Sequence, residues 1–563
     1  MPTAFSPPRF LPVALPLALL ALFSAGPVLA QGATTVQSAQ TLPGARYLAG
    51  PEAQADARAW LGVLAADSLE GREAASPGER RAAAHLAHWL AEMGVAPGGD
   101  MVDGARTYFQ AFPVRTAGLD PARTVLTLEG GATAELGDEW LTIPSAVPDI
   151  DGTFDVVFAG YGLSDPAQGY DDYAGLDVAG KVVVVLGGHP TGIDSVTTMG
   201  GVMPANALPA KFIPAMQRGA RALLIVAGGD LLENWSGYRS FALGTAMMPD
   251  DGTPPQTAPA VFGFLHPDFA GPMLAAAGAP ADLLTGLEEG AAVAPIADAG
   301  RVRLGVGVAR GTGEGRNVVG VLEGSGADAG EFVAIGAHYD HLGIVDGEIH
   351  NGADDDGSGT TAVLAVADAL ARDRAAGRGP NRSVVFVFHS AEEKGLFGSA
   401  FFTDHPERSV LGSIDRAVAQ VNLDMVGREH PDSLYVIGAD RLSTAFGQTV
   451  VAANAALESG GLFTLDRTFD APDHPENLYQ RSDHYNYARF GVPIVFFTDG
   501  MGANWAKGED RDDYHRPDDD IESIDFGKLV NTARLAYTIG RVTADAAERP
   551  VVDHPVEAEA GSH

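Results

Sequence analysis

The sequence predicts an α/β protein: a mostly parallel, helix-covered mixed sheet with an inserted β-rich domain. From about residue 317 to 546, apolar segments of strand length alternate with helical stretches, which is typical of parallel sheets covered on both faces. In contrast, residues 124–310 contain short β-branched runs separated by Gly, Pro and Asp turns, with room for one or two helices. We therefore interpret this region as a module inserted into a host domain.

The composition excludes several classes of protein. The 563 residues are 46% hydrophobic, which is enough for a large core. Lys and Arg number 37 against 73 Asp and Glu, a formal net charge of −36, so binding to nucleic acid or to an anionic membrane surface is not expected. Cysteine is absent, which excludes disulfides, thiolate nucleophiles and cysteine zinc ligands. Any metal site must therefore use histidines and carboxylates.

The first 30 residues have the pattern of a cleavable export signal. Arg9 precedes an apolar stretch over residues 11–25, and small residues follow up to Ala30. Pro12 and Pro16 interrupt this stretch, which is shorter than the ~20 apolar residues that span a membrane. We expect cleavage after Ala30 and an exported protein, periplasmic or extracellular, without a membrane anchor.

The hydrophobic pattern divides the rest of the chain into the N-terminal part of the host domain (31–123), the insert (124–310), the C-terminal part of the host domain (311–546) and a flexible tail (547–563). Helices are expected over 53–66 and 77–93, where apolar residues recur at helical spacing. The insert is expected to contain strands at 156–161, 181–186 and 222–226 and a helix at 210–218. In the C-terminal part, strands are expected at 317–322, 332–336, 384–388, 417–423 and 492–497, and helices at 359–374, 396–403, 443–457 and 526–544.

Potential metal ligands follow three of these strands. His338 and Asp340 follow the strand at 332–336, Glu392 and Glu393 follow the next, and Asp424 follows the third. An Asp-Asp-Asp run at 354–356 precedes a helix between the first two. Because the carboxyl ends of parallel strands meet at one edge of a sheet, we expect these groups to converge. Each alone has an ordinary explanation, such as a solvated turn or a helix cap, but so many buried carboxylates repel one another unless cations neutralise them.

Two divalent metal ions satisfy this requirement. One bridging carboxylate, with one terminal carboxylate and one His for each ion, would hold two zinc ions ~3.5–4 Å apart with a shared water between them. His338 and Asp340 lie two residues apart on an extended segment, so their side chains share a face and Asp340 can orient the imidazole. The side chains of the neighbours Glu392 and Glu393 diverge, so that one can bind metal while the other acts as a general base.

The sequence at these positions resembles the co-catalytic zinc exopeptidases, a family that includes secreted bacterial aminopeptidases and glutamate carboxypeptidases. The resemblance covers about residues 317–543 and is carried in order by 338–340, 352–359, 391–395, 422–425 and 514–515, with an N-terminal counterpart at 67–72. It implies that His338 and Asp424 bind one zinc ion, that Glu393 and His515 bind the other, and that the carboxylate of Asp355 bridges the two. It further implies that Glu392 deprotonates the bridging water and that Tyr514 hydrogen-bonds the oxyanion.

The insert resembles a protease-associated domain through residues 170–173, 180–184 and 217–225. Modules of this kind are thought to cover or shape the substrate entrance rather than to supply catalytic groups. Three further groups are expected to have no role in metal binding. Residues 481–484 would organise a loop near the pocket, His341 and His350 are expected to be exposed, and most of the acidic residues 510–520 around His515 are expected to form a solvated turn.

The expected function is that of an exported di-zinc exopeptidase acting on peptides, most simply an aminopeptidase. Neither H-E-x-x-H nor G-x-S-x-G occurs, so single-zinc thermolysin-like and serine-hydrolase functions lack their signatures. Three alternatives share the fold: a carboxypeptidase, which needs a cationic pocket for the substrate carboxylate; a glutaminyl cyclase, which uses one zinc; and a non-catalytic binding homologue. Oligomeric state and the preferred substrate side chain are left open.

Overall fold

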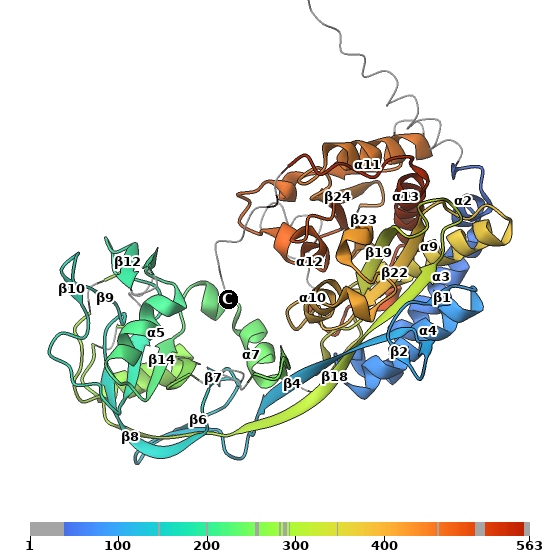
Figure 1. Cartoon of the computed structure of the whole chain (residues 1–563). Coiled ribbons are helices and arrows are strands. Elements are labelled where there is room, and N and C mark those ends of the chain that lie inside the picture. The colour runs from blue at the N-terminus through green and yellow to red at the C-terminus, as the bar shows by residue number, and fades with distance from the viewer. Residues whose placement is uncertain are drawn as a thin grey trace, which may run out of the picture.

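The computed structural model describes residues 39–556, apart from 145–146, 199–200, 254–257, 281–282, 285–289, 292, 346, 429, 459–460, 501–512 and 555. The predicted export signal at 1–30 lies outside these residues. Among the helices of the described part, none is long and apolar enough to cross a membrane. The described chain forms two bodies that are connected by long strands (Figure 1).

The larger body is built around a mixed sheet with the strand order β15-β4-β18-β22-β19-β23-β26-β24-β25, and β1 also pairs with β18. The strands are β15 (Ala246–Pro249), β4 (Phe109–Leu119), β18 (Val308–Leu322), β22 (Ser383–His389), β19 (Phe332–His338), β23 (Ala417–Leu423), β26 (Ile494–Thr498), β24 (Ser433–Ile437), β25 (Thr464–Asp466) and β1 (Ala96–Pro97). Parallel pairs join β22, β19, β23 and β26 at the centre, and β24 to β25. Parallel pairing covers a smaller part of the sheet than the sequence predicted, because β4 and β18 form a long antiparallel pair.

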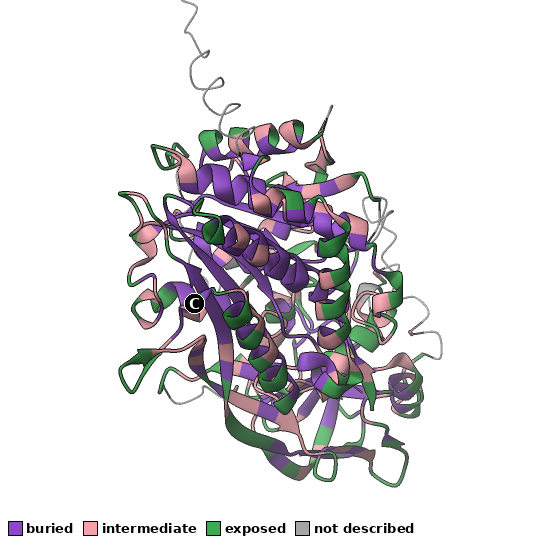
Figure 2. Ribbon diagram, turned by 90° about the vertical axis from the view of Figure 1, so that its right-hand side faces the viewer, coloured by how far each residue is buried: buried purple, intermediate pink, exposed green. Residues whose placement is uncertain are grey.

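Helices cover both faces of this sheet. On one face lie α2 (Pro43–Leu48), α3 (Pro51–Leu64), α4 (Pro77–Glu92), α9 (Gly357–Ala375), α11 (Thr444–Leu457) and α13 (Phe526–Asp545), which share one core with alternate residues of β19 and β22. On the other face lie α10 (Phe397–Asp404) and α12 (His484–Ala488), which pack on the intervening strand residues. The central strands are buried along their whole length, as the purple ribbons in Figure 2 show. This two-sided burial explains why the strands have continuous apolar sequences.

The smaller body contains a second mixed sheet, in the order β6-β5-β17-β8-β11-β14-β16-β7. Its strands are β6 (Thr133–Ala134), β5 (Val125–Leu128), β17 (Arg301–Val306), β8 (Ile150–Phe158), β11 (Val182–Leu186), β14 (Ala222–Val226), β16 (Val261–Leu265) and β7 (Trp140–Thr142). The helices α5 (Leu208–Gln217), α6 (Asp230–Glu233), α7 (Trp235–Leu243) and α8 (Pro267–Ala276) accompany it. Short two-stranded ladders complete the structure: β2 (Met101–Val102) with β3 (Ala105–Arg106), β9 (Ser164–Asp165) with β10 (Tyr170–Asp171), β12 (Ser195–Thr198) with β13 (Gly201–Pro204), and β20 (Gly343–Val345) with β21 (Glu348–His350).

The prediction of one or two helices in the insert is therefore wrong. Strands β8, β11, β14 and β16 pair in parallel. Helix α5 lies between β11 and β14 in sequence, α6 and α7 lie between β14 and β16, and α8 follows β16. The helix expected at 210–218 is α5, although Pro214 lies inside it. Helix α8 was not predicted because Pro272 lies inside it, and an internal proline normally argues against a helix. That this body is a protease-associated domain remains a prediction.

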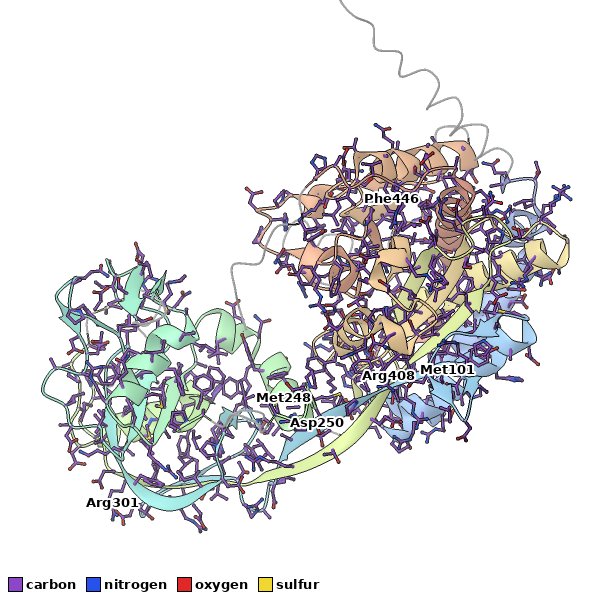
Figure 3. The ribbon with its side chains drawn as sticks, viewed as in Figure 1. Met101, Met248, Asp250, Arg301, Arg408 and Phe446 are labelled. Carbon is purple, nitrogen blue, oxygen red and sulfur yellow. The ribbon has the colours of Figure 1, made fainter. Side chains whose placement is uncertain are left out.

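The connection between the two bodies is the β4–β18 pair, whose register runs from Val308 opposite Leu119 to Val318 opposite Phe109. Residues 309–312 of β18 are exposed, because the strand here runs between the two bodies (Figure 1). Strand β15 extends the larger sheet beside β4, and Asp250, labelled in Figure 3, directly follows it. The guanidinium of Arg115 contacts the carboxylate of Asp250 at 2.8 Å at this edge. The smaller body is thus attached through the antiparallel β4–β18 pair of the larger sheet.

Candidate metal centre

The predicted ligands lie together at the carboxyl edge of the central parallel strands. His338 is the last residue of β19, and Asp424 directly follows β23. Glu392 and Glu393 lie just beyond β22, and Asp355 lies directly before α9. Parallel pairing of β22, β19 and β23 brings these three strand ends together, as open α/β sheets do at their ligand sites.

Two sets of donor atoms share the carboxylate of Asp355. In the first, Nε2 of His338 lies 3.4 Å from Oδ1 of Asp355 and 3.5 Å from Oδ1 of Asp424. In the second, Nε2 of His515 lies 3.2 Å from Oδ2 of Asp355 and 3.2 Å from Oε2 of Glu393. Ligands bound tetrahedrally to zinc at ~2.0–2.1 Å are about 3.3 Å apart. Both sets therefore fit a zinc-like cation, and Asp355 can bridge the two.

The charges in this cluster also favour cations. Burial raises the pKa of Glu392 well above its usual range, and the negative charges of Asp424 and Glu393 add to this effect against the opposing charge of His338. Burial would likewise raise the pKa of Asp355, but hydrogen bonds from His338 and His515 hold that pKa well below its usual range. Bound cations would stabilise the ionised carboxylates in place of the positive charge of protonated histidines.

The two adjacent glutamates diverge as the sequence predicted. Glu393 faces His515, whereas Oε2 of Glu392 approaches Nε2 of His338 only to 4.0 Å. The side chain of Glu392 is 12% exposed and lines a cavity of about 330 Å³ together with the donor atoms. Glu392 is therefore placed beside the donor sets and open to the cavity, as a general base must be.

Hydrogen bonds from other elements hold the ligand carboxylates. The hydroxyl of Ser482 donates to Oδ2 of Asp424 at 2.7 Å, leaving Oδ1 for the first donor set. The backbone N–H of Asp355 donates to Asp519 at 3.0 Å. Asp356 caps α9 by accepting from the N–H of Gly359 at 2.8 Å, so it supports the helix and is no ligand. These contacts fix the ligand loop between β21 and α9.

The predicted role of Asp340 needs correction. Nδ1 of His338 lies 3.2 Å from the backbone carbonyl of Asp340, whereas the Asp340 carboxylate is 3.9 Å away. The carboxylate is engaged elsewhere, because its Oδ1 accepts the backbone N–H of Glu392 at 3.2 Å. The backbone of Asp340 therefore orients the imidazole, and its carboxylate holds the turn that carries Glu392.

Residues 317–539 match the sequence profile of Peptidase family M28. This segment belongs to that family. It contains all five predicted ligands: His338, Asp355, Glu393, Asp424 and His515. The recognition of a co-catalytic zinc exopeptidase family is therefore confirmed.

Relatives of the M28 segment include leucine aminopeptidase 2 of Trichophyton rubrum, which is 26% identical over 236 residues. These residues cover 39% of this chain and 43% of that protein. The chain spans about half the length, 43–52%, of such relatives. The fold resembles that of an aminopeptidase from Aneurinibacillus sp. strain AM-1, with a TM-score of 0.54, 20% identity, and 90% of this chain and 98% of that chain covered. A zinc aminopeptidase from Bacillus subtilis is similar, with a TM-score of 0.54, 18% identity, and coverage of 89% and 97%.

Tyr514 lines the cavity of the M28 segment, and its ring stacks on His515 with 3.9 Å between centroids. Burial, followed by the charges of Asp355 and Glu393, raises the pKa of Tyr514 well above its usual range. The phenol therefore stays protonated and can donate a hydrogen bond into the cavity.

The expectation that His341 and His350 are exposed is wrong. His341 is fully buried and His350 is 6% exposed. Nδ1 of His341 lies 2.7 Å from Oε1 of Glu393, so this histidine belongs to the metal centre. Its position three residues after His338, on the same loop, was a signal that sequence reasoning left unused.

Arg72 is a second residue whose role the sequence did not reveal. Its side chain is 1% exposed, and its guanidinium donates to four backbone carbonyls, those of Leu64, Tyr339, Asn351 and Gly352. The carbonyl of Tyr339 lies between His338 and His341 in sequence, those of Asn351 and Gly352 precede Asp355, and that of Leu64 ends α3. Arg72 therefore ties both ligand loops to the N-terminal segment and brings a positive charge under the carboxylate cluster.

Replacing Arg72 by methionine is expected to destabilise the metal-free protein by about 3 kcal/mol or more, because several buried carbonyls lose a charged donor. Urea unfolding at neutral pH measures this change. Arg81→Met is the matched control: its partly exposed side chain pairs with Glu70, and its loss should cost below about 1 kcal/mol. Equal effects of the two substitutions would show that Arg72 does not brace the ligand loops.

Residues 481–484 organise the pocket, and His484 lies beneath it. The His484 ring stacks on Phe496, a lining residue, with 4.5 Å between centroids. Burial lowers the pKa of His484 from its ordinary 6.5 to about 3. As pH falls below 6.5, the unfolded chain therefore binds a proton that the folded protein does not.

This difference in proton binding predicts that the difference in unfolding free energy between the wild type and His484→Phe depends on pH. Between pH 6.5 and about 3, the wild type should lose about 1.4 kcal/mol of unfolding free energy per pH unit relative to the variant. Urea unfolding of both proteins at about pH 7.5 and about pH 5.5 measures this free-energy difference. A difference that stays constant between these pH values would contradict burial of a neutral imidazole.

Proposed function

We propose that the protein is an exported di-zinc metallo-aminopeptidase that hydrolyses N-terminal residues from peptides. The observation that carries the proposal is a carboxylate, Glu392, open to a cavity beside two donor sets that share Asp355. Export rests on the signal-like residues 1–30, and periplasmic or extracellular location follows from it. Zinc is proposed because the ligands are histidines and carboxylates at near-tetrahedral separations.

When bound, two divalent ions would supply Lewis-acid activation of the scissile carbonyl and of a water. Glu392, beside the donor sets and open to the cavity, would accept the proton of the attacking water and pass it to the leaving amine. The Tyr514 hydroxyl, kept protonated by burial, would donate to the oxyanion of the tetrahedral intermediate. Asp424 is held by Ser482 and Asp355 by Asp519, so the ligands need little rearrangement during the reaction.

The cavity supports an apolar N-terminal side chain. Four apolar residues line it: Leu396, Met425, Leu478 and Phe496. Relatives with the printed name leucine aminopeptidase agree with this preference. We expect leucine at the substrate N-terminus to be cleaved about 10-fold or more faster than aspartate, because an apolar wall leaves a carboxylate unsolvated.

One feature favours the carboxypeptidase alternative. Arg481 lines the cavity and is partly exposed, although its guanidinium pairs with Glu476 at 2.9 Å. A free guanidinium could bind a substrate carboxylate. A glutaminyl cyclase, which needs one zinc ion, is less favoured because the second donor set is intact.

The deciding experiment is hydrolysis of one leucyl dipeptide series by metal-stripped, zinc-restored protein. The substrates carry either a free or an acetylated N-terminus and either a free or an amidated C-terminus. We expect zinc-dependent cleavage that is abolished by acetylation and little affected by amidation. Dependence on the free carboxylate instead would identify a carboxypeptidase, and zinc binding without cleavage would favour the cyclase or the binding homologue.

A further inference from the structure

Two histidines approach the same carboxylate of the second donor set. Nε2 of His515 lies 3.2 Å from Oε2 of Glu393, and Nδ1 of His341 lies 2.7 Å from Oε1 of the same side chain. Both histidines, with Asp355 and Glu393, could in principle belong to one metal ion. The distances from each histidine to Asp355 and Glu393 show which histidine is placed as a metal ligand and which one contacts a ligand instead.

The contacts of His515 match those of a metal ligand, whereas the contacts of His341 do not. His515 is equidistant, at 3.2 Å, from Asp355 and Glu393, close to the ~3.3 Å expected between two ligands of tetrahedral zinc. His341 lies 2.7 Å from Glu393 but 4.0 Å from Asp355. The shorter distance is that of a charge-assisted hydrogen bond, and the longer one exceeds the ~3.3 Å expected between two ligands of tetrahedral zinc.

The position of the His341 ring is fixed by its surroundings. Gly352 has a φ of +55°, and a Cβ there would come within 2.5 Å of the His341 ring, so the bare glycine backbone lets the ring pack closely. The backbone N–H of His341 donates to the carbonyl of Arg72 at 3.4 Å. The ring also meets His515 edge to face, with 5.8 Å between centroids. Because the His341 ring is fixed in this way, its hydrogen bond can fix the orientation of the Glu393 carboxylate.

We propose that His341 is a positioning residue for the second metal site. Its Nδ1–H donates to Oε1 of Glu393 and thereby turns Oε2 toward the ion that His515 and Asp355 also bind. Among the described residues, Nε2 of His341 has no hydrogen-bond partner, which agrees with the proton residing on Nδ1. The proposal rests on the proposed function insofar as the second donor set must hold a metal.

The test compares His341→Leu with His341→Asn by zinc affinity. Leucine removes the donor, whereas the asparagine amide N–H occupies nearly the place of Nδ1. Competition with a chromophoric chelator gives the dissociation constants of the two zinc ions. For the leucine variant we expect one constant to weaken about 10- to 100-fold and the other to stay unchanged, as is typical when a partner of a metal ligand is lost. The asparagine variant should recover most of the lost affinity.

His389→Leu provides the matched control. His389 is also fully buried, but its ring contacts Tyr487 and Phe402 rather than a ligand. This variant should lose stability yet keep both zinc constants. Circular dichroism and thermal melts of the metal-free proteins show whether each variant is folded, and the asparagine variant keeps the test decisive if the leucine variant is not.

Three results would overturn the proposal. Unchanged zinc constants in His341→Leu would show that Glu393 needs no positioning. Equal losses in the leucine and asparagine variants would show that the donated hydrogen bond is not the cause. Complete loss of one ion in His341→Leu but not in His515→Ala would make His341 the ligand itself. Failure of the wild type to bind a second ion would instead refute the proposed function.

Discussion

Replacement of Glu392 by glutamine is expected to lower kcat about 10²- to 10⁴-fold while both metal ions stay bound, because the substitution removes the proton acceptor and retains the side chain's shape. Glu392 lies beside the donor sets without belonging to either: its closest approach to His338 is 4.0 Å. Steady-state hydrolysis of a leucyl substrate, together with metal analysis of the same sample, measures both effects.

Glu407→Gln is the matched control for this prediction. Glu407 is exposed and is not among the residues that line the cavity, so the same change of charge there should leave kcat within about twofold. Normal turnover in Glu392→Gln would remove this residue from the mechanism. Loss of metal together with loss of turnover would instead place Glu392 among the ligands.

Replacement of Asp355 by asparagine is expected to weaken both metal ions together. Its two oxygens face different histidines, Oδ1 toward His338 and Oδ2 toward His515, and an amide cannot offer two anionic donors. The loss should exceed the ~10–100-fold typical of residues that only support a ligand. Zinc competition with a chromophoric chelator reports both dissociation constants.

Asp368→Asn is the control for that measurement. Asp368 lies on α9, the helix that follows Asp355, and pairs with Arg372 at 3.0 Å on the outer part of the molecule. Both zinc constants should be unchanged in this variant. Selective loss of one ion in Asp355→Asn would mean that Asp355 is a terminal ligand and that the two donor sets are separate sites.

The central part of the fold could be predicted from the sequence because its strands are buried on both faces. Strand β23 (Ala417–Leu423) lies where the apolar run predicted it, and β19 and β22 extend the predicted segments by a few residues. The ligands that end these strands could be found for the same reason, since parallel topology brings strand ends to one edge. Helix boundaries at capped positions, such as Pro77 in α4, also agree.

The features that the sequence did not reveal depend on contacts between distant segments. Residues 309–312, near the start of β18, lack the apolar pattern of a strand, because they are exposed and pair with β4 alone. Arg72 donates to three carbonyls more than 260 residues away in sequence, and His341 contacts Glu393, which follows another strand. Such roles require the tertiary structure, because a charged or polar residue in a loop is most often exposed.

The most direct test of the account is an anomalous-diffraction map at the zinc edge from crystals of the zinc-loaded protein. We expect two peaks, each close to one carboxylate oxygen of Asp355. One should lie within about 2.2 Å of donor atoms of His338 and Asp424, and the other equally close to donor atoms of Glu393 and His515. We further expect Nδ1 of His341 to be directed at Oε1 of Glu393 rather than at a metal ion. A single peak, or a peak coordinated by His341 in place of His515, would contradict the account.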